Sequence, residues 1–348
     1  MKRMRVGLLL VLGLPFPGAA LAAEAREPEP PGRWKFGSTL GLNLSQSAFS
    51  ANWAGGDRGS LVWVLTTRSG AERQITRAFR WSNKLDLAYG QTAKQVEDAS
   101  GNGLRWDPPD KTTDAIAFEA LARWTLGGLV DPYAALGAES QFQDQSDPRG
   151  AIALNPVKLK ESAGVARRLF RTADGEALTR LGVAFRQAIA KSFRDPLGRD
   201  QARFTSNDGG IEWRTDLRQP VLERKVLYEG TLLVYQPVLY SKSRALEDVD
   251  AALRAADPGR EAIAGFWKTA DLNLLNTFTA QITKHLGVNL TVQWVYDRFD
   301  AAALVDPALA SSTDPVVRAA YAAQVDKNVR KAGQFREVLA LALSYQLF

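Results

Sequence analysis

Long runs of alternating apolar and polar residues constrain the fold of this chain more than any other feature of its sequence. In the stretch from Gln74 to Gly90 the apolar positions fall on one side of the alternation: Ile75, Phe79, Trp81, Leu85, Leu87 and Tyr89. The other side carries polar and small residues, among them Arg80, Lys84 and Asp86. Side chains on a strand point to opposite faces with a period of two, so this segment has one apolar and one polar wall. Charges in the middle of a strand face are tolerated where that face lines a hydrated lumen and the other meets lipid.

The spacing of such segments predicts about twelve strands. The expected strands are 34–47, 59–69, 74–93, 111–126, 130–143, 156–170, 176–192, 207–219, 222–241, 262–283, 286–300 and 333–348. Short turns are expected near 69–71, 127–128, 172–175, 219–220 (Gln219-Pro220) and 284–287. They alternate with long connections at 48–58, 94–110, 144–155, 193–206, 242–261 and 301–332. Outer-membrane barrels have short periplasmic turns, long outer loops and an even number of strands. The sequence therefore predicts an all-β fold, a closed antiparallel transmembrane β-barrel over residues 34–348.

The N-terminus has the pattern of an export signal. Basic residues at positions 2, 3 and 5 precede an apolar stretch and the small residues Ala20-Leu21-Ala22, which predicts a signal peptide over residues 1–22. Residues 23–33 are Pro-rich and charged, which is typical of a flexible periplasmic lead-in. Without the three basic residues of the signal, 41 Lys and Arg face 38 Asp and Glu, so the mature chain carries +3 rather than +6. This balance does not require a nucleic-acid partner. The expected location is the outer membrane of a Gram-negative bacterium, with its lipid as a partner.

The C-terminal segment and the tryptophans support a membrane barrel. Leucines at 339, 341, 343 and 347 alternate with small or polar residues, and the chain ends at Phe348. A last strand ending in Phe is similar to the signal that barrel-insertion machinery recognises, although Tyr345 lies three residues before the end rather than the usual two. Six tryptophans fall on expected strands: Trp63, Trp81, Trp124, Trp213, Trp267 and Trp294. An aromatic girdle at the lipid boundary and ordinary core packing both explain them.

The composition excludes several chemistries. The chain has no cysteine, which removes disulfides, thiolate catalysis and Cys-based metal sites. Its single histidine, His285, falls in an expected periplasmic turn, away from the rim where barrel hydrolases place a general base. We therefore expect no enzyme activity, no cofactor and no metal site.

Several short stretches together are similar to one family of barrels. They are residues 42–46 and 52–56, then 83–90, 111–114, 155–158 and 295–297. They resemble, in order, the domain-of-unknown-function family 3078 of outer-membrane β-barrel proteins. The resemblance implies a location and an architecture, and no reaction.

Charged residues on the inward faces are the candidate functional residues. The set expected to line the lumen is Arg80, Lys84, Asp86, Arg123, Lys158, Lys160, Arg180, Arg186, Arg214, Arg218, Asp271 and Asp297. Rings of charge set selectivity in pores, and the basic strands from 156 to 219 favour a mild preference for anions. Alternatively, the charges pair across the barrel and close it, although some water must enter because burying so many dry is costly.

Two kinds of long connection stand out. The loop containing Asn52, Trp53, Gly55 and Gly56 offers flexible backbone and a flat aromatic surface, which suits either a small polar ligand or a tight loop on the rim. Helices are expected in two outer loops. One places Leu246, Val249 and Leu253 on a single face, and the other starts at Asp314-Pro315. Either helix could cap the outer mouth, constrict the lumen or lie on the surface.

Together these features predict an outer-membrane barrel of unassigned activity. A narrow pore for passive or weakly selective passage of small polar or anionic solutes is the first expectation. A non-conducting structural or interaction barrel that uses its long outer loops is the alternative, and an outer-membrane enzyme comes third.

Overall fold

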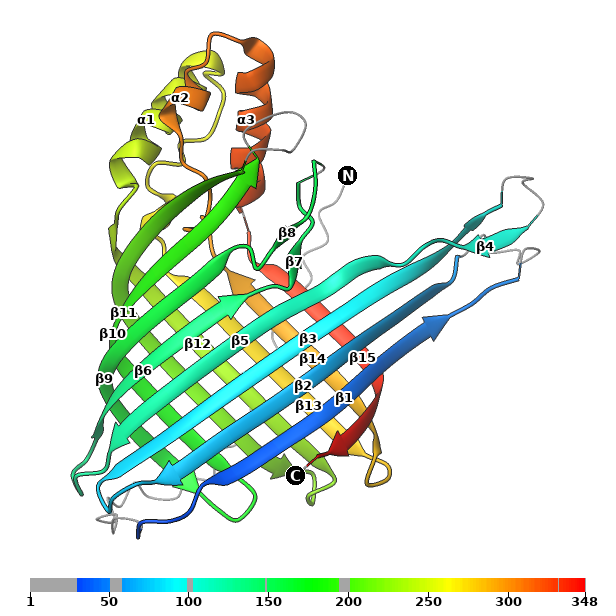
Figure 1. The fold of residues 1–348 in the computed structure, drawn as a ribbon, viewed down its shortest axis with the longest axis vertical. Helices are drawn as coiled ribbons and strands as arrows, with labels where there is room; N and C mark the ends of the chain where they lie inside the picture. The colour runs from blue at the N-terminus through cyan, green and yellow to red at the C-terminus, as the bar shows by residue number, and fades with distance from the viewer. Residues whose placement is uncertain are drawn as a thin grey trace, which may run out of the picture.

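The computed structural model describes residues 30–50, 58–98, 103–147, 149–193, 201–330 and 332–347. Within them, twelve long antiparallel strands close into one barrel (Figure 1). The barrel strands are β1 (Lys35–Ser47), β2 (Ser60–Gln74), β3 (Phe79–Glu97), β5 (Asp110–Trp124), β6 (Asp131–Ser140), β9 (Val157–Arg171), β10 (Glu176–Phe193), β11 (Gln201–Val221), β12 (Val226–Tyr240), β13 (Asp271–Gln281), β14 (Leu286–Tyr296) and β15 (Gln334–Gln346). Each pairs with its neighbours in the chain, and β1 closes on β15. The predicted fold class, strand number and antiparallel closure are confirmed.

The remaining elements lie in the long connections at one end of the barrel. β4 (Leu104–Trp106) pairs antiparallel with the outer end of β3, and β7 (Gln143–Asp144) pairs with β8 (Ile152–Ala153). The connection between β12 and β13 carries α1 (Ser243–Ala256) and the short helix η1 (Phe266–Lys268). The connection between β14 and β15 carries α2 (Pro307–Ala310) and α3 (Pro315–Asn328). The two predicted loop helices are therefore confirmed.

Both helices pack on the faces that their sequences predict, and α3 starts where predicted. The carboxylate of Asp314 accepts the backbone N–H of Val316 at 2.8 Å, and Pro315 occupies the first turn, where no N–H is needed. Leu246, Val249 and Leu253 are buried, together with Tyr321 of α3. These residues form one apolar cluster that reaches down to Tyr240 at the end of β12 and Phe299 after β14. The two loops thus form a helical cap, standing on the β10–β11 side of the barrel in Figure 1.

Two of the predicted turns are wrong. Ser69, Gly70 and Ala71 lie inside β2, opposite Ser38, Gly37 and Phe36 of β1, and the chain turns at 75–78. A glycine in a strand can face another glycine across the ladder without turning the chain. Gln219 and Pro220 likewise belong to β11, and the turn is made by Leu222, Glu223 and Arg224, all with positive φ. Left-handed backbone at three non-glycine residues has no sequence signature.

The strand predicted over 262–283 is also too long. β13 begins at Asp271, and Trp267 lies in η1, where its ring packs on Tyr240 at 5.8 Å between centroids. Trp267 is therefore part of the cap and not of a strand girdle. Trp124, Trp213 and Trp294 do lie on barrel strands and are exposed.

The outer surface of the barrel is apolar. Along β10, Leu181, Val183 and Phe185 are exposed, whereas Arg180 and Ala184, on the alternate positions, are each 3 % exposed. Along β15, Leu339, Leu341 and Leu343 are exposed while Ala340 and Ala342 are buried. Apolar side chains outside and charged ones inside are the arrangement of a barrel whose solvent is lipid.

No helix in the described part of the chain is long and apolar enough to cross a membrane.

Candidate functional site

Contacts between strands that are not neighbours identify the inner face of the barrel. Arg180 of β10 donates to both carboxylate oxygens of Glu119 on β5 at 3.1 Å, although β9 and β6 lie between these strands. Arg68 of β2 donates to Glu229 of β12 at 3.1 Å, with four strands between them on the shorter way round. Such side chains can meet only across the concave side of the sheet. The lumen is therefore lined by charged residues that cross it.

The most buried group of lumen charges centres on Glu119. Its carboxylate accepts from Arg180 and also from Arg214 Nη1 at 3.0 Å. Arg214 Nε bonds both carboxylate oxygens of Asp216, at 3.1 and 3.0 Å, and Thr231 donates to the same carboxylate at 3.1 Å. The Arg180 side chain is 3 % exposed and that of Glu119 17 %. This cluster, Glu119–Arg180–Arg214–Asp216, fills the lumen beside β10 and β11.

A second group of charges is in contact with water. Glu229 bridges Arg68 at 3.1 Å and Arg218 at 3.6 Å, and Arg68 also lies 3.4 Å from Asp86. The side chains of Arg68, Asp86 and Arg218 are 66, 54 and 60 % exposed. Inside a barrel, exposure on this scale means that part of the lumen is wide enough for solvent.

Nearer the short turns, ion pairs line the barrel wall. Arg80 pairs with Glu72 at 2.5 Å, and Arg168 with Glu176 at 2.9 Å. Arg123 lies 3.8 Å from Asp131, and both side chains are almost fully buried.

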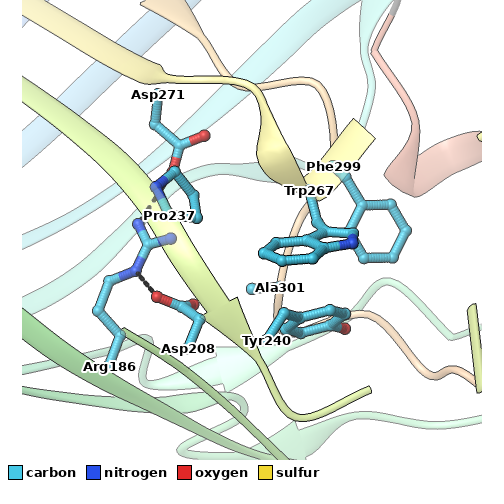
Figure 2. Close-up of a pocket in the computed structure, with 8 residues that line it drawn as sticks. All are labelled: Arg186, Asp208, Pro237, Tyr240, Trp267, Asp271, Phe299 and Ala301. Atoms are coloured by element: carbon cyan, nitrogen blue, oxygen red, sulfur yellow. Dashed lines mark hydrogen bonds and ion pairs between the residues drawn. The ribbon is translucent and has the colours of Figure 1, made fainter. Parts of the chain in front are cut away.

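The outer half of the lumen contains a clasp built around Arg186 (Figure 2). Arg186 of β10 donates to Asp208 of β11 at 2.7 Å and to Asp271 of β13 at 3.0 Å. Its guanidinium lies 3.6 Å above the ring of Tyr235, whose hydroxyl donates to Asp208 at 2.5 Å. Asp271 is the first residue after the cap loop that carries η1. The clasp thus joins the cap connection to the barrel wall.

Two antiparallel segments of the chain form a ribbon that crosses the outer mouth of the lumen. Its outgoing part is 297–302 and its returning part is 328–330, joined by an antiparallel bridge between Phe299 and Val329. Asp300 of the ribbon pairs with Lys158 of β9 at 3.3 Å, and Ser206 of β11 donates to the Ala301 carbonyl. Four barrel strands lie between β14, where the ribbon starts, and β9. The ribbon therefore spans the mouth and is tied to the far wall.

Electrostatics hold Asp300 ionised in this position. Burial alone would raise the pKa of Asp300, but Lys158, the backbone N–H of Ala302 and Arg330 together outweigh burial. The net effect lowers its pKa below the ordinary value. At the root of the ribbon, Arg330 also pairs with Asp297 at 2.8 Å.

A cavity with an empty volume of about 830 Å³, partly open to solvent, lies beneath the ribbon. Its basic lining residues are Lys158, Lys160 and Arg186. Its acidic lining residues are Glu139, Asp208, Glu212, Asp271, Asp297 and Asp300. Acids outnumber bases by six to three in this lining, and Glu212 pairs with Lys160 at 2.8 Å, Asp300 with Lys158 and Asp297 with Arg330.

The structure brings most of the predicted lumen residues together in these groups. Arg80 and Arg123 lie near the short turns, Arg180 and Arg214 in the Glu119 cluster, and Arg186 in the clasp. Lys84 is exposed, in register with Glu119 on the neighbouring strand. The predicted ligand loop, with Asn52, Trp53, Gly55 and Gly56, lies outside the described residues.

Sequence reasoning missed Arg68, Asp208, Tyr235, Asp300 and Arg330. Asp208 already lies within the expected strand 207–219 and shares the alternation of Glu212 and Arg214, so following that alternation to the start of the strand would have found it. Asp300 and Arg330 lie in a connection without periodic signal, and only the path of the ribbon reveals them.

No candidate metal site lies in the parts of the chain that the structure describes. No group of three or more His, Asp and Glu side chains there is placed to hold a metal ion. His285 lies in the turn between β13 and β14, where its ring stacks on Tyr345 at 5.5 Å.

Comparisons with known proteins support the family resemblance over part of the chain. The model of the family described as "Protein of unknown function (DUF3078)" matches residues 44–145. No curated protein matches the chain.

The chain is similar to several solved barrel structures at low identity. The translocator domain of the autotransporter NalP from Neisseria meningitidis is 10 % identical, with 90 % of this chain and 87 % of that chain covered and a TM-score of 0.37. An outer membrane channel from Pseudomonas putida F1 is 12 % identical, with coverages of 92 and 96 % and a TM-score of 0.38. The β domain of the Bordetella autotransporter Brka is 14 % identical, with coverages of 91 and 99 % and a TM-score of 0.30.

Proposed function

We propose that this chain is an outer-membrane β-barrel whose lumen is a narrow passage for small polar solutes, constricted at its outer mouth by the 297–302 ribbon. The observation that carries the proposal is the solvent exposure of Arg68, Asp86 and Arg218 inside a barrel with an apolar outer surface. Charged side chains exposed within a lumen support a hydrated path. The same surface supports the proposed outer-membrane location, because a closed barrel leaves no strand edge exposed to lipid and its apolar exterior suits a bilayer.

The path is narrow because side chains cross it. Arg68 and Glu229 meet from nearly opposite walls, and the Glu119 cluster occupies the β10–β11 side. A solute must pass between these ion pairs, which favours small and well hydrated species. The anion preference expected from the basic strands stays a prediction, and the six acids of the outer cavity oppose it. The reversal potential under a salt gradient measures which group dominates.

The ribbon offers a direct test of the passage. The chain has no native cysteine, so a disulfide can be introduced cleanly. Ser206→Cys with Ala301→Cys would tie the ribbon to β11, where these residues already touch. A matched control, Phe299→Cys with Val329→Cys, would tie the ribbon to itself at its natural bridge without attaching it to the wall.

We expect the purified, refolded mature protein to give discrete conductance steps in planar bilayers. Oxidising the Ser206–Ala301 pair should reduce or abolish the steps, reduction should restore them, and the control pair should behave like the parent protein. A correctly folded barrel that gives no steps, even when residues 298–330 are replaced by a short Gly-Ser linker, would contradict the proposal.

A second candidate is a non-conducting barrel that presents its outer loops to a partner. The observation in its favour is the cap, whose helices share an apolar cluster and so form an ordered unit outside the membrane. This candidate predicts that trimming 301–332 abolishes partner binding and leaves permeability unchanged. We also propose that β15 and the residues after it, up to Phe348, are the part recognised by the barrel-insertion machinery.

A further inference from the structure

The seam between the first and last strands is the shortest in the barrel. β1 and β15 align over six residue pairs, from Thr39 opposite Gln346 to Leu44 opposite Leu341. Every other pair of neighbouring barrel strands aligns over eight to eighteen residues. The barrel wall is therefore least complete at its point of closure.

Both strands continue past the seam but no longer pair with each other. β15 remains paired with β14 up to Gln334, and β1 remains paired with β2 up to Ser47. Among the described residues, no backbone hydrogen bond closes the free edges of 334–340 and 45–47. In Figure 1 the outer end of β1 rises toward β4, whereas that of β15 rises toward the helices. The wall therefore splits into a wedge that widens toward the outer side.

Exposure along β15 changes where its pairing with β1 ends. From Ala340, the first residue not paired with β1, toward the seam, buried Ala340 and Ala342 alternate with exposed Leu341 and Leu343, as in a closed wall. Above Ala340, all six residues of 334–339 are exposed, so both faces of the strand are uncovered. Val338 faces the lumen. It is paired with Thr291 of β14, which is paired with Thr277 of β13 and, through it, with Glu229 of β12. Glu229 contacts Arg68 across the lumen, so this row of paired residues points inward. The Val338 side chain, on a residue 39 % exposed, therefore lies on the lumen side of the split.

The two sides of the split differ in chemistry. The outward side carries Phe335, Leu339 and Leu44, continuous with the apolar surface, and the charged Glu337 lies between Phe335 and Leu339 on the same face. The inward side is mostly polar, with Ser45 on β1 and Arg336 on β15. At the closed end, the Asn289 side chain of β14 donates to Asn43 of β1 at 3.1 Å, passing over Ala340 and Ala342 of β15. Arg336 is exposed, and no ion pair or hydrogen bond engages its side chain within the described residues.

We propose that this split is a lateral opening through which an amphiphile with an anionic head and a hydrocarbon chain passes between the outer leaflet and the lumen. Its chain would lie against Leu339, Phe335 and Leu44, and its head would meet Arg336 on the inner side. Free strand edges next to hydrocarbon leave N–H and C=O groups unsatisfied at considerable cost. A polar head and its water satisfy them. The proposal goes beyond passage along the barrel axis and does not depend on conduction.

The position of Val338 allows a direct test. A fluorophore on Val338→Cys in an otherwise cysteine-free chain reports contact at the split. The matched control is Thr277→Cys, in the same inward row, on a strand paired along both edges. In phosphatidylglycerol–phosphatidylcholine vesicles with brominated acyl chains, we expect the Val338 label to be quenched and the Thr277 label to stay bright. Equal fluorescence of the two labels would overturn the proposal.

Binding of a defined probe tests the anionic head. Undecanoate with a bromine at its tail should quench the Val338 label and bind more tightly than its uncharged methyl ester. Because Arg336 is exposed, Arg336→Gln should weaken undecanoate about three- to tenfold and leave the ester unchanged. The same affinity for undecanoate in both proteins would remove Arg336 from the site.

Closing the seam tests the route itself. Ser45 and Ala340 would be the next partners after Leu44 and Leu341, so a Ser45→Cys, Ala340→Cys pair that oxidises within one chain closes the split. Undecanoate quenching at Val338 should then be lost and return on reduction, while heat-modifiable migration on gels shows that the barrel stays folded. Unchanged quenching in the oxidised protein would contradict the lateral route. A disulfide forming between two copies would assign this edge to strand pairing instead.

Discussion

Glu119 is the residue on which the buried lumen charges depend most. Its carboxylate is shared by Arg180 and Arg214, at 3.1 and 3.0 Å, and Asp216 is the other acid within bonding distance of both. The substitution Glu119→Gln keeps the size of the side chain and removes its charge. Two guanidinium groups would then share one carboxylate, in a part of the lumen where Arg180 is 3 % exposed.

The expected loss follows from burial. Removing one partner of a buried ion pair costs about 3–5 kcal/mol, because the remaining charge stays in a poorly solvated place. The Glu119 side chain is 17 % exposed and that of Arg214 22 %, so some water relieves the cost, and Gln can still accept one hydrogen bond. We therefore expect the free energy of unfolding to fall by about 3 kcal/mol, at the lower end of that range.

Glu229→Gln is the matched control. Glu229 also pairs with two arginines, Arg68 at 3.1 Å and Arg218 at 3.6 Å, but their side chains are 66 and 60 % exposed. Exposed pairs contribute about 0–1 kcal/mol, so this variant should lose at most about 1 kcal/mol.

The two variants can be compared directly by urea unfolding of the refolded protein in lipid vesicles, followed by tryptophan fluorescence. A loss for Glu119→Gln within about 1 kcal/mol of the loss for Glu229→Gln would refute the reasoning. It would mean that water reaches the Glu119 cluster as freely as it reaches Arg68.

Three further predictions concern the ribbon, the cap and the wall. The Lys158–Asp300 contact contributes stability above the ordinary pKa of an aspartate, about 3.9, and loses it as the pH falls through the lowered pKa of Asp300. Step conductance should therefore stay constant from neutral pH to about 4 and rise below that, whereas Asp300→Asn should raise it at neutral pH. Leu246→Ala should cost the cap about 2–5 kcal/mol, because Leu246 is 1 % exposed, and hydrogen exchange should accelerate in α1 but not in β10. Gly182→Ala should reduce the yield of heat-modifiable barrel, since a Cβ there overlaps the Ala163 carbonyl. Gly137→Ala should not, since its nearest neighbour would be 3.6 Å away.

The barrel could be predicted from the sequence because the alternation of apolar and polar residues within each strand reflects the lipid on one face and the lumen on the other. Alternation at 176–192 requires one face toward lipid and one toward the lumen, and β10 places Leu181 outside and Arg180 inside accordingly. Strand ends carry less information. Pro220 suggested a turn, yet a proline at the end of a strand can be accommodated where its missing N–H is not needed. Trp267 looked like a strand residue because a short apolar stretch fits a cap as well as a wall.

The functional arrangement depends on contacts that no local pattern encodes. Arg68 and Glu229 are 161 residues apart in the chain, and their meeting depends on barrel circumference and strand stagger. Asp300 acquires its role only because the ribbon crosses from β14 to β9. A list of inward charges therefore predicts the lining of the lumen, but not which charges close it.

The ribbon and the seam together change how access to the lumen should be considered. The ribbon covers the part of the lumen mouth between β14 and β9, where it contacts Lys158 and Ser206. The split lies between β1 and β15. In the strand order it is therefore on the opposite side of β14 from the strands that the ribbon covers. Loosening the ribbon should thus increase axial conductance without altering quenching at Val338, and closing the seam should do the reverse. If one change moved both readouts, the two openings would form a single path, and the ribbon would have to move as part of the wall.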